Sequence, residues 1–414
     1  MSDNRYFDAR ETRSPDERLA EQMTMVRTLL DHARSHSRYW AEQLGDVDPA
    51  AIREPADMAR IPLTRKEDIP GQQAEQPPFG GMEAASMAHM AHVFQSPGPI
   101  FEAAEDKNDY WRFGRSFWAA GLRPGDLVHN TLSYHLTPAG MMLDSGARAV
   151  GCPVFPAGIG NTDVQVEAIE RLRPSVYAGT PSFLKALLDK GQELGRDVRS
   201  IDRALVGAEP LSSSLREEMG NRGVRVLQMF GTAELGLVAY ESDAVEGLIT
   251  DEDVLLEVVR PGSGDPVAEG EVGEMVVTVL RVGAFPIIRF ATGDMTALLP
   301  GPSPCGRTAP RIKGWMGRAN QTTKVKGMFV TPEQINGVMA RHSEVRRARL
   351  VVTRENERDA MTLHVETESG DAGLSDSIAE SLQAITKMRG DVRVAAEGEL
   401  PNDGKVIADE RSFE

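Results

Sequence analysis

Residues 230–234, Phe-Gly-Thr-Ala-Glu, have the types and the spacing that a nucleotide site requires. An aromatic ring offers a stacking face for a base, and the glycine after it lets the backbone approach a ligand. Thr232 and Glu234 supply a hydroxyl for phosphate and a carboxylate for a hard cation. A strand-to-loop corner with an ordinary surface glutamate would look the same, so these residues alone favour neither interpretation.

The elements around this segment predict where it lies. Residues 225–230 alternate and are rich in β-formers, which indicates a strand ending at the segment. Further upstream, helical and extended patterns alternate, with strands expected at 127–130, 149–155, 175–178 and 203–206 and helices at about 106–120, 138–148, 162–172 and from 181. This alternation of helices and strands predicts an α/β fold with a parallel sheet. In such folds, ligands bind at the carboxyl ends of the strands.

Three further regions complete the predicted organisation. A helix is expected over about 14–44, and residues 70–99 are predicted to be mostly loop. Beyond Glu241, strands at 254–259, 273–280 and 287–290 indicate a β-rich subdomain. After residue 318 the pattern predicts a small α+β unit. We therefore expect an N-terminal domain over 1–318, with an α/β core at about 90–240 and a β-rich subdomain at about 241–318, and a C-terminal domain over 321–414.

Composition excludes several classes of function. A net charge of −16 over 414 residues leaves no basic surplus for general nucleic-acid binding. The two cysteines, Cys152 and Cys305, offer neither a disulfide framework nor a four-ligand zinc site. No apolar run reaches the roughly 18 residues that span a bilayer, and the polar start is unlike a signal peptide. We expect a cytoplasmic protein with no membrane association.

Several separated stretches, in order along almost the whole chain, resemble the adenylate-forming superfamily and specifically its phenylacetate–CoA ligase-like branch. They are Gly207-Ala208-Glu209-Pro210, Phe230-Gly231-Thr232-Ala233-Glu234, Arg289-Phe290-Ala291-Thr292-Gly293-Asp294, Gly317-Arg318-Ala319-Asn320, Lys324-Val325-Lys326-Gly327 and Gly404-Lys405. Each motif is weak by itself, but the ordered set is specific. The resemblance implies that the small C-terminal domain is a mobile lid that turns about a hinge at Asn320.

The resemblance also implies a role for individual residues. Phe230 flanks adenine, Glu234 binds Mg²⁺, Asp294 holds the ribose hydroxyls and Lys405 is the catalytic lysine, assisted by Thr232. The remaining positions implied in cofactor binding are Gly207, Ala208, Glu209, Pro210, Gly231, Arg318, Lys324, Lys326 and Gly327. The acid pocket is expected near Tyr134, His135, Gly236 and Leu237.

The activity implied is that of an AMP-forming ligase. Joining a small carboxylic acid to AMP builds charge at the α-phosphate, which positive groups and a cation must stabilise. The cofactors implied are ATP, AMP, Mg²⁺ and CoA. The thiol acceptor is either CoA or the phosphopantetheine of an acyl or aryl carrier protein, and a homodimer is possible.

One stretch departs from the family pattern. The family carries a hydroxyl- and glycine-rich phosphate loop ending in lysine, but residues 94–102 hold one serine, one glycine, two prolines and Glu102. Such a loop offers few backbone donors to a triphosphate. Two alternatives to the ligase therefore stay open, namely an ATP-independent acyltransferase between CoA and a carrier protein and a non-catalytic nucleotide- or CoA-binding protein. Ser303 replaces a cysteine found in some relatives, so no structural zinc is expected.

Overall fold

A computed structural model describes residues 5–96, 99–260, 264–316, 319, 323–326, 328–330, 332–355, 358–367, 373–396, 398–401 and 405–411. The chain forms two compact units, Met1–Trp315 and Met316–Glu414. Among the described residues, no helix combines the length and the apolar character needed to cross a bilayer.

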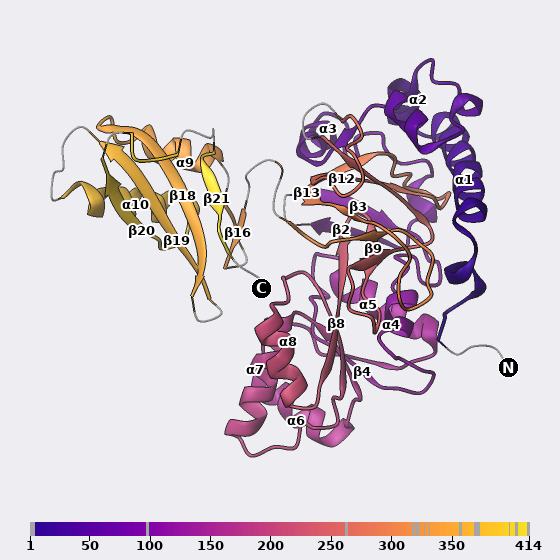
Figure 1. The fold of residues 1–414 in the computed structure, drawn as a ribbon, viewed down its shortest axis with the longest axis horizontal. Coiled ribbons are helices and arrows are strands. Elements are labelled where there is room, and N and C mark those ends of the chain that lie inside the picture. Colours follow the sequence, from indigo (N-terminus) through magenta and orange to yellow (C-terminus); the bar gives the residue numbers. More distant parts are fainter. Residues whose placement is uncertain are drawn as a thin grey trace. The chain divides into compact units, whose positions relative to one another are not determined.

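The first unit contains the expected parallel sheet. Its parallel strands run in the order β8 (Arg225–Thr232), β7 (Arg203–Val206), β6 (Val176–Gly179), β4 (Val128–Asn130) and β5 (Val154–Pro156). Helices α6 (Thr162–Leu172), α7 (Pro181–Glu193) and α8 (Ser213–Asn221) cover one face, and α4 (Gly114–Ala119) and α5 (Ala139–Val150) cover the other (Figure 1). This arrangement confirms the predicted α/β class.

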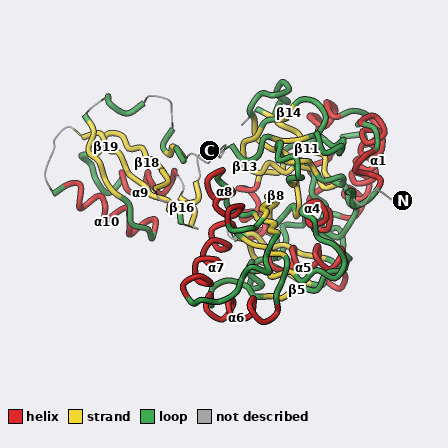
Figure 2. Tube along the Cα trace, turned by 60° about the horizontal axis from the view of Figure 1, so that its bottom comes forward, coloured by secondary structure: helices red, strands yellow, loops and turns green. Residues whose placement is uncertain are grey.

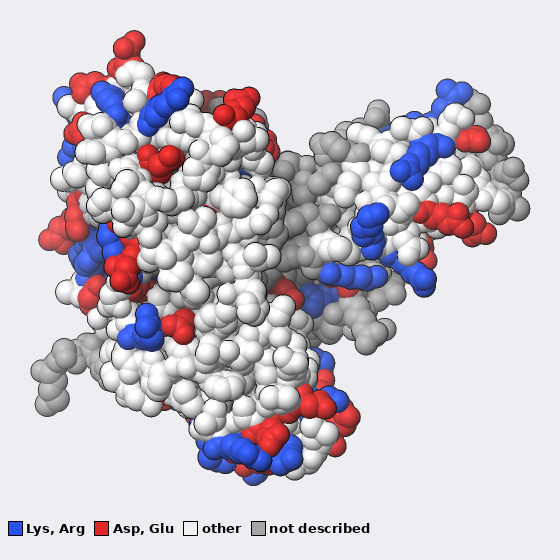
Figure 3. Space-filling view, turned by 180° about the vertical axis from the view of Figure 1, so that it is seen from behind, with Lys and Arg blue, Asp and Glu red and all other residues white. Residues whose placement is uncertain are grey.

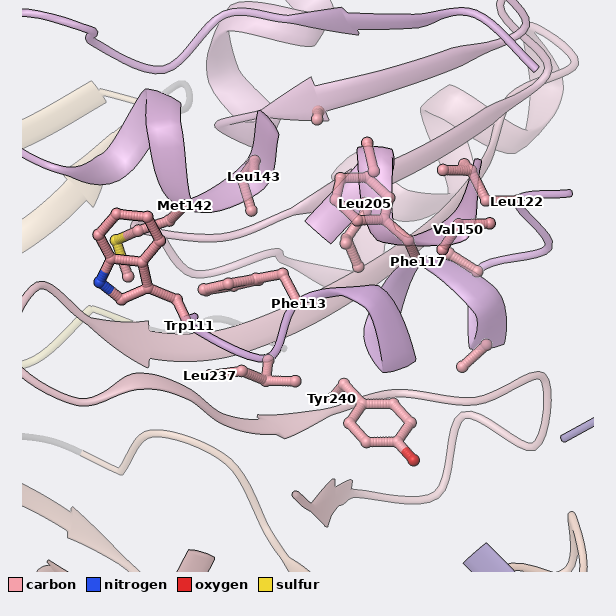
Figure 4. Packing of buried hydrophobic residues seen from close by; sticks show 14 of the residues in the cluster. Trp111, Phe113, Phe117, Leu122, Met142, Leu143, Val150, Leu205, Leu237 and Tyr240 are labelled. Carbon is pink, nitrogen blue, oxygen red and sulfur yellow. The ribbon is translucent and has the colours of Figure 1, made fainter. Parts of the chain in front are cut away.

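Alternating side chains supply the two faces of this sheet. In β6, Tyr177 packs with α6–α8, whereas Val176 and Ala178 pack with α4 and α5. The second of these cores also encloses Trp111 and Leu237, which Figure 4 shows among its labelled side chains. Burial on both faces is typical of a parallel sheet.

The same sheet continues beyond residue 241, across the expected boundary between the α/β core and the β-rich subdomain. Because β9 (Gly236–Tyr240) folds back antiparallel on β8, the strands that follow extend the sheet at that edge. They are β10 (Leu248–Thr250), β15 (Arg311–Ile312) and β14 (Leu298–Leu299).

A second sheet of the first unit joins distant segments. Its order is β1 (Thr64–Arg65), β13 (Phe290–Thr296), β12 (Gly273–Val279) and β11 (Val254–Val259). The N-terminal helix packs against this region but is interrupted, with α1 (Pro15–His36) and α2 (Arg38–Leu44) separated at Ser37. Ser37 ends the first helix because its hydroxyl accepts a hydrogen bond from Trp40 N and caps the second one.

Two local expectations differ from the structure. The helix expected from residue 106 begins only at Gly114, because Asp109 and Arg112 both adopt left-handed backbone conformations. The expected loop over 94–102 is mainly a hairpin of β2 (His92–Ser96) and β3 (Ile100–Ala104). Phe94 of this hairpin packs on Trp111 with ring centroids 6.0 Å apart.

The second unit is the expected α+β fold. Strands β20 (Asp391–Ala395), β19 (Arg358–Thr367), β18 (Val345–Glu355) and β21 (Ile407–Asp409) form one sheet, and β16 (Thr323–Val325) pairs with β17 (Met328–Val330). Helices α9 (Pro332–Met339) and α10 (Leu374–Thr386) lie on the same side of β18 and β19 (Figure 2). Their apolar residues share a core with this sheet.

Charged side chains on the visible face of the first unit are mixed in sign. Figure 3 shows Lys and Arg next to Asp and Glu rather than a field of one sign. Around α6 and α7 these charges are paired, as in Arg171 with Glu167 and Arg196 with Glu170. On this visible face, the described residues of the first unit form no continuous basic track for a polyanion.

Candidate active site

The parallel topology brings two of the predicted motifs to one edge of the sheet. Strands β7 and β8 are hydrogen-bonded neighbours with Val206 opposite Gln228, so the loop of residues 207–210 lies next to the end of β8. A Cβ added at Gly207 would meet the Met229 side chain at 3.0 Å, so the two segments are in close contact. Ala208 and Glu209 are exposed beyond this contact.

Glu234 lies in the turn between β8 and β9. In this turn Thr232 pairs with Gly236, and the Thr232 hydroxyl accepts a hydrogen bond from Leu235 N at 3.2 Å. Gly231 and Gly236 allow the strands to meet there, since a Cβ at Gly231 would lie 2.5 Å from the Gly236 carbonyl oxygen. The Glu234 carboxylate is consequently turned inward, with a side chain only 5 % exposed.

The partner of Glu234 is a lysine that the sequence analysis missed. Lys66 Nζ lies 2.6 Å from Glu234 Oε1, and the lysine side chain is 31 % exposed. Burial opposes ionisation of Glu234, but the Lys66 ammonium and the Thr232 hydroxyl favour its charged form and hold its pKa below the ordinary value. Glu234 is therefore an ionised carboxylate in an ion pair.

Lys66 owes its position to a short parallel pairing between distant segments. Thr64 pairs with Phe290 of β13, and its hydroxyl donates to the Ile288 carbonyl, 224 positions later in the chain. Lys66 then opens the short 3-10 helix η4 (Lys66–Asp68). No local sequence pattern indicates a two-residue strand, so periodicity could not reveal this lysine.

A buried ion pair secures that connection. Arg289 and Glu257 face each other through two hydrogen bonds, of 3.1 Å and 2.9 Å, and both side chains are less than a tenth exposed. Arg289 Nη1 also donates to the Ile61 carbonyl at 2.6 Å. The arginine of the Arg-Phe-Ala-Thr-Gly-Asp segment therefore anchors the chain just ahead of Lys66.

Asp294, the expected ribose ligand, is held at its strand by two local hydrogen bonds. Trp315 Nε1 donates to Asp294 Oδ1 at 2.9 Å, and Asp294 N donates to the Thr292 hydroxyl at 3.1 Å. Glu274 is the neighbouring carboxylate, and it accepts a hydrogen bond from Gly293 N at 3.2 Å. The sequence analysis missed Trp315, which follows a glycine and carries no motif of its own.

The adjacent residues Arg65 and Lys66 each face a different acidic side chain. Arg65 Nη1 lies 4.0 Å from Glu274 Oε2, beside Asp294, while Lys66 pairs with Glu234. Burial raises the pKa of Glu274 and Arg65 opposes that shift. A nucleotide that engages Asp294 and the end of β8 would meet both cations.

Glu102 of β3 adds a second carboxylate beside Glu234. Burial and, after it, the charge of Glu234 raise its pKa to about 8, against the opposing effects of Ser96 and Lys66. Glu102 and Glu234 both line an enclosed cavity of about 30 Å³, room for about one water molecule. Its other walls are mainly apolar and aromatic, among them Trp40, Phe94, Trp111 and Phe290.

The expected acid pocket is only partly supported. Leu237 has no exposed surface and belongs to the core, and a Cβ at Gly236 would lie 2.8 Å from the Trp111 carbonyl oxygen, so neither residue borders open space. Tyr134 is half-buried and accepts a hydrogen bond from Asn130 Nδ2 at 2.8 Å, and burial raises its pKa. His135 is exposed. Leu237 packs in the core that also contains Trp111 and Phe113, and its place in the acid pocket stays a prediction.

The structure describes only some of the site residues expected from the C-terminal domain, and their roles stay predictions. Lys405 is exposed and precedes β21, while Lys324 lies in β16 and Lys326 follows it with its N–H bound to Asp359 Oδ2 at 3.0 Å. Arg318, Gly327 and the hinge residue Asn320 lie outside the described residues. Cys152 and Cys305 are free thiols.

Comparison with known proteins defines the class. Residues 114–280 match the model of the AMP-binding enzymes. The chain is 33 % identical over 390 residues to the phenylacetate–coenzyme A ligase of Thermus thermophilus, covering 89 % of this chain and 84 % of that protein. It is 27 % identical to the corresponding ligase of Escherichia coli, over 98 % of this chain and 97 % of that protein.

The chain therefore belongs to the phenylacetate–coenzyme A ligase family of adenylate-forming enzymes. A solved structure of 2-hydroxyisobutyryl-CoA ligase with 2-HIB-AMP and CoA has the same fold, with a TM-score of 0.81 and 24 % sequence identity. That comparison covers 100 % of this chain and 94 % of the other.

Proposed function

We propose that this protein joins a small carboxylic acid to AMP and then transfers the acyl group to the thiol of CoA. One observation carries the proposal. Arg65 and Lys66, adjacent in sequence, link Glu234 at the end of β8 to the neighbourhood of Asp294, next to the loop of residues 207–210. Two adjacent cations that face Glu234 and the Glu274–Asp294 region support this proposal in a chain of the adenylate-forming family.

The proposed roles follow from the chemistry of each side chain. Asp294, oriented by Trp315, accepts hydrogen bonds from the two ribose hydroxyls. Phe230 provides an apolar face for adenine, and Lys66 supplies positive charge toward the α-phosphate. Lys405 brings a further positive charge to the adenylation step from the C-terminal unit. CoA is the proposed acceptor, and a carrier-protein phosphopantetheine would present the same thiol.

The direct test is pyrophosphate release with a panel of aryl and short aliphatic acids, with and without CoA. A ligase releases pyrophosphate only with its acid, and it forms a thioester only when CoA is added. A matched variant, Asp294→Asn, keeps the size of the side chain but removes its charge. Pyrophosphate release that is equally fast in this variant would contradict the assigned ribose site.

A second function, ATP-independent acyl transfer between CoA and a carrier protein, is favoured by the hairpin of β2 and β3. The backbone of this hairpin is used in strand pairing, with Ser96 opposite Ile100 and Phe94 opposite Glu102. Donors engaged in a ladder are unavailable to the β- and γ-phosphates of ATP. Glu102 also places a carboxyl group beside Glu234.

Two measurements separate these functions. Calorimetry with AMP and with ATP should show that ATP binds no more tightly than AMP, because the additional phosphates gain few donors. Acyl transfer from acyl-CoA to a carrier thiol without nucleotide would establish the second function. Tight Mg²⁺-dependent ATP binding with fast acyl-adenylate formation would refute it and leave the ligase.

A further inference from the structure

The surroundings of Glu234 differ from those of a magnesium ligand. Mg²⁺ requires near-octahedral oxygen ligands at about 2.0–2.1 Å and usually retains several waters. Here an ammonium group already contacts Glu234 Oε1 at 2.6 Å, and the adjacent cavity has room for about one water molecule. The residues do not fit this ion.

We propose that the Lys66 ammonium takes the place of the divalent cation at Glu234. The inference rests on the proposed nucleotide site and concerns how its charge is balanced. Lys66 is fixed in place, since β1 pairs with β13 and the buried Arg289–Glu257 pair holds the segment ahead of it. Glu234 is fixed by the tight turn in which Thr232 pairs with Gly236.

This arrangement predicts how a nucleotide meets the site. A lysine that pairs with a 5 %-exposed carboxylate and is itself 31 % exposed can contact solvent and Glu234 at once. Its remaining N–H donors can reach a phosphate without a bridging ion, because an ammonium group carries three donors. AMP binding is then independent of Mg²⁺, and any Mg²⁺ that arrives with ATP is held by the phosphates.

The test combines calorimetry with Mn²⁺ as a paramagnetic probe. The affinity for AMP should be equal in EDTA and in millimolar Mg²⁺, within about twofold, a difference too small to reflect a bridging ion. Titration of the wild-type protein with Mn²⁺, with and without AMP, should give the same electron paramagnetic resonance signal of the free ion as the matching solution without protein. Retention of one Mn²⁺ by the wild type that Glu234→Gln abolishes would overturn the proposal.

Substitution of the lysine gives a second, independent readout. Lys66→Met should weaken AMP binding in EDTA by about tenfold, the usual effect of losing a charge-assisted hydrogen bond. Mn²⁺ should then bind to the vacated carboxylate and restore part of the affinity. Lys107→Met, which removes an exposed lysine 3.0 Å from Glu105, is the matched control and should behave as wild type. Unchanged AMP affinity in Lys66→Met would also overturn the proposal.

These outcomes distinguish the inference from the proposed function. If AMP fails to bind to the wild type under any condition, the nucleotide site itself is refuted, while the Mn²⁺ titration of the protein alone still decides the charge balance at Glu234. If AMP binds and Mn²⁺ is retained at Glu234, the nucleotide site is supported and the proposed role of Lys66 is refuted. The wild-type titration needs no variant, so a folding defect in Lys66→Met cannot obscure it.

Discussion

Replacing Glu102 by glutamine should stabilise the protein near neutral pH. The carboxyl group is 7 % exposed and its pKa is raised to about 8 from an ordinary value of 4.5, first by burial and then by the charge of Glu234. The other groups acting on it, Ser96 and Lys66, oppose this shift only in part. Glutamine keeps the shape of the side chain and cannot ionise.

The magnitude follows from proton linkage. An acid with a raised folded-state pKa binds its proton more tightly in the folded than in the unfolded chain. The free energy of unfolding is therefore undiminished by Glu102 below pH 4.5 and falls as pH rises toward 8. At about 1.4 kcal/mol per pKa unit, the loss is about 3 kcal/mol at pH 7 and about 5 kcal/mol above pH 8. A buried carboxamide costs about 1–2 kcal/mol itself, which leaves a net gain of about 1–2 kcal/mol at pH 7.

The assay is denaturant-induced unfolding of wild type and Glu102→Gln at several pH values between 5 and 9. The free energy of unfolding of the variant should rise steadily relative to that of the wild type as pH rises, and the difference should level off above pH 8. Glu217→Gln, an exposed position on α8, is the control and should track the wild type. A difference between Glu102→Gln and wild type that is constant across this range would refute the reasoning, because it would show that Glu102 does not titrate in the window.

Three further substitutions test the proposed active site. Asp294→Ala should weaken AMP binding by about 1–3 kcal/mol, since the ribose hydroxyls lose a charged acceptor, and unchanged affinity by calorimetry would remove Asp294 from the site. Trp315→Phe deletes only the N–H that orients Asp294 and should cost about 1 kcal/mol in AMP affinity with the melting temperature nearly unchanged; a large fall in stability alone would indicate a packing role instead. Lys405→Ala should slow adenylation by about two orders of magnitude while thioester formation from synthetic acyl-AMP survives; equal loss in both half-reactions would contradict a lysine that serves adenylation only.

The parts of the fold that the sequence predicted are those with local patterns. Alternation of helix and strand placed β4, β6, β7 and β8 in a parallel sheet, and this topology brings residues 207–210 beside Met229 in β8. Thr180 with Pro181 predicted the start of α7, where the threonine hydroxyl accepts from Phe183 N at 3.3 Å. Each of these signals spans a few residues, so no long-range information was needed.

The parts that the sequence did not predict depend on pairing between distant segments. Lys66 reaches Glu234 because Thr64 pairs with Phe290, which lies 226 positions later in the chain. The sequence could not predict this pairing, because a two-residue strand has no periodicity. Leu237 follows the motif, and the sequence did not show that it packs in the core after the reversal of β9. The sequence also contained no sign that antiparallel strands from beyond residue 241 extend the parallel sheet, because that pairing too is long-range.

The hairpin of β2 and β3, which carries Glu102, and the Lys66 side chain together determine how negative charge is balanced around Glu234. Lys66 is the only cation paired with Glu234 among the described residues, and Glu102 lies close enough to raise that local negative charge when it ionises. One ammonium balances one carboxylate, so the other carboxyl keeps its proton near neutral pH. A single phosphate can share the Lys66 donors without disturbing this balance. A triphosphate brings further negative charge next to a hairpin in which backbone N–H groups donate to carbonyl oxygens of the partner strand. We therefore expect the proposed site to be better matched in charge to AMP and acyl-adenylate than to ATP.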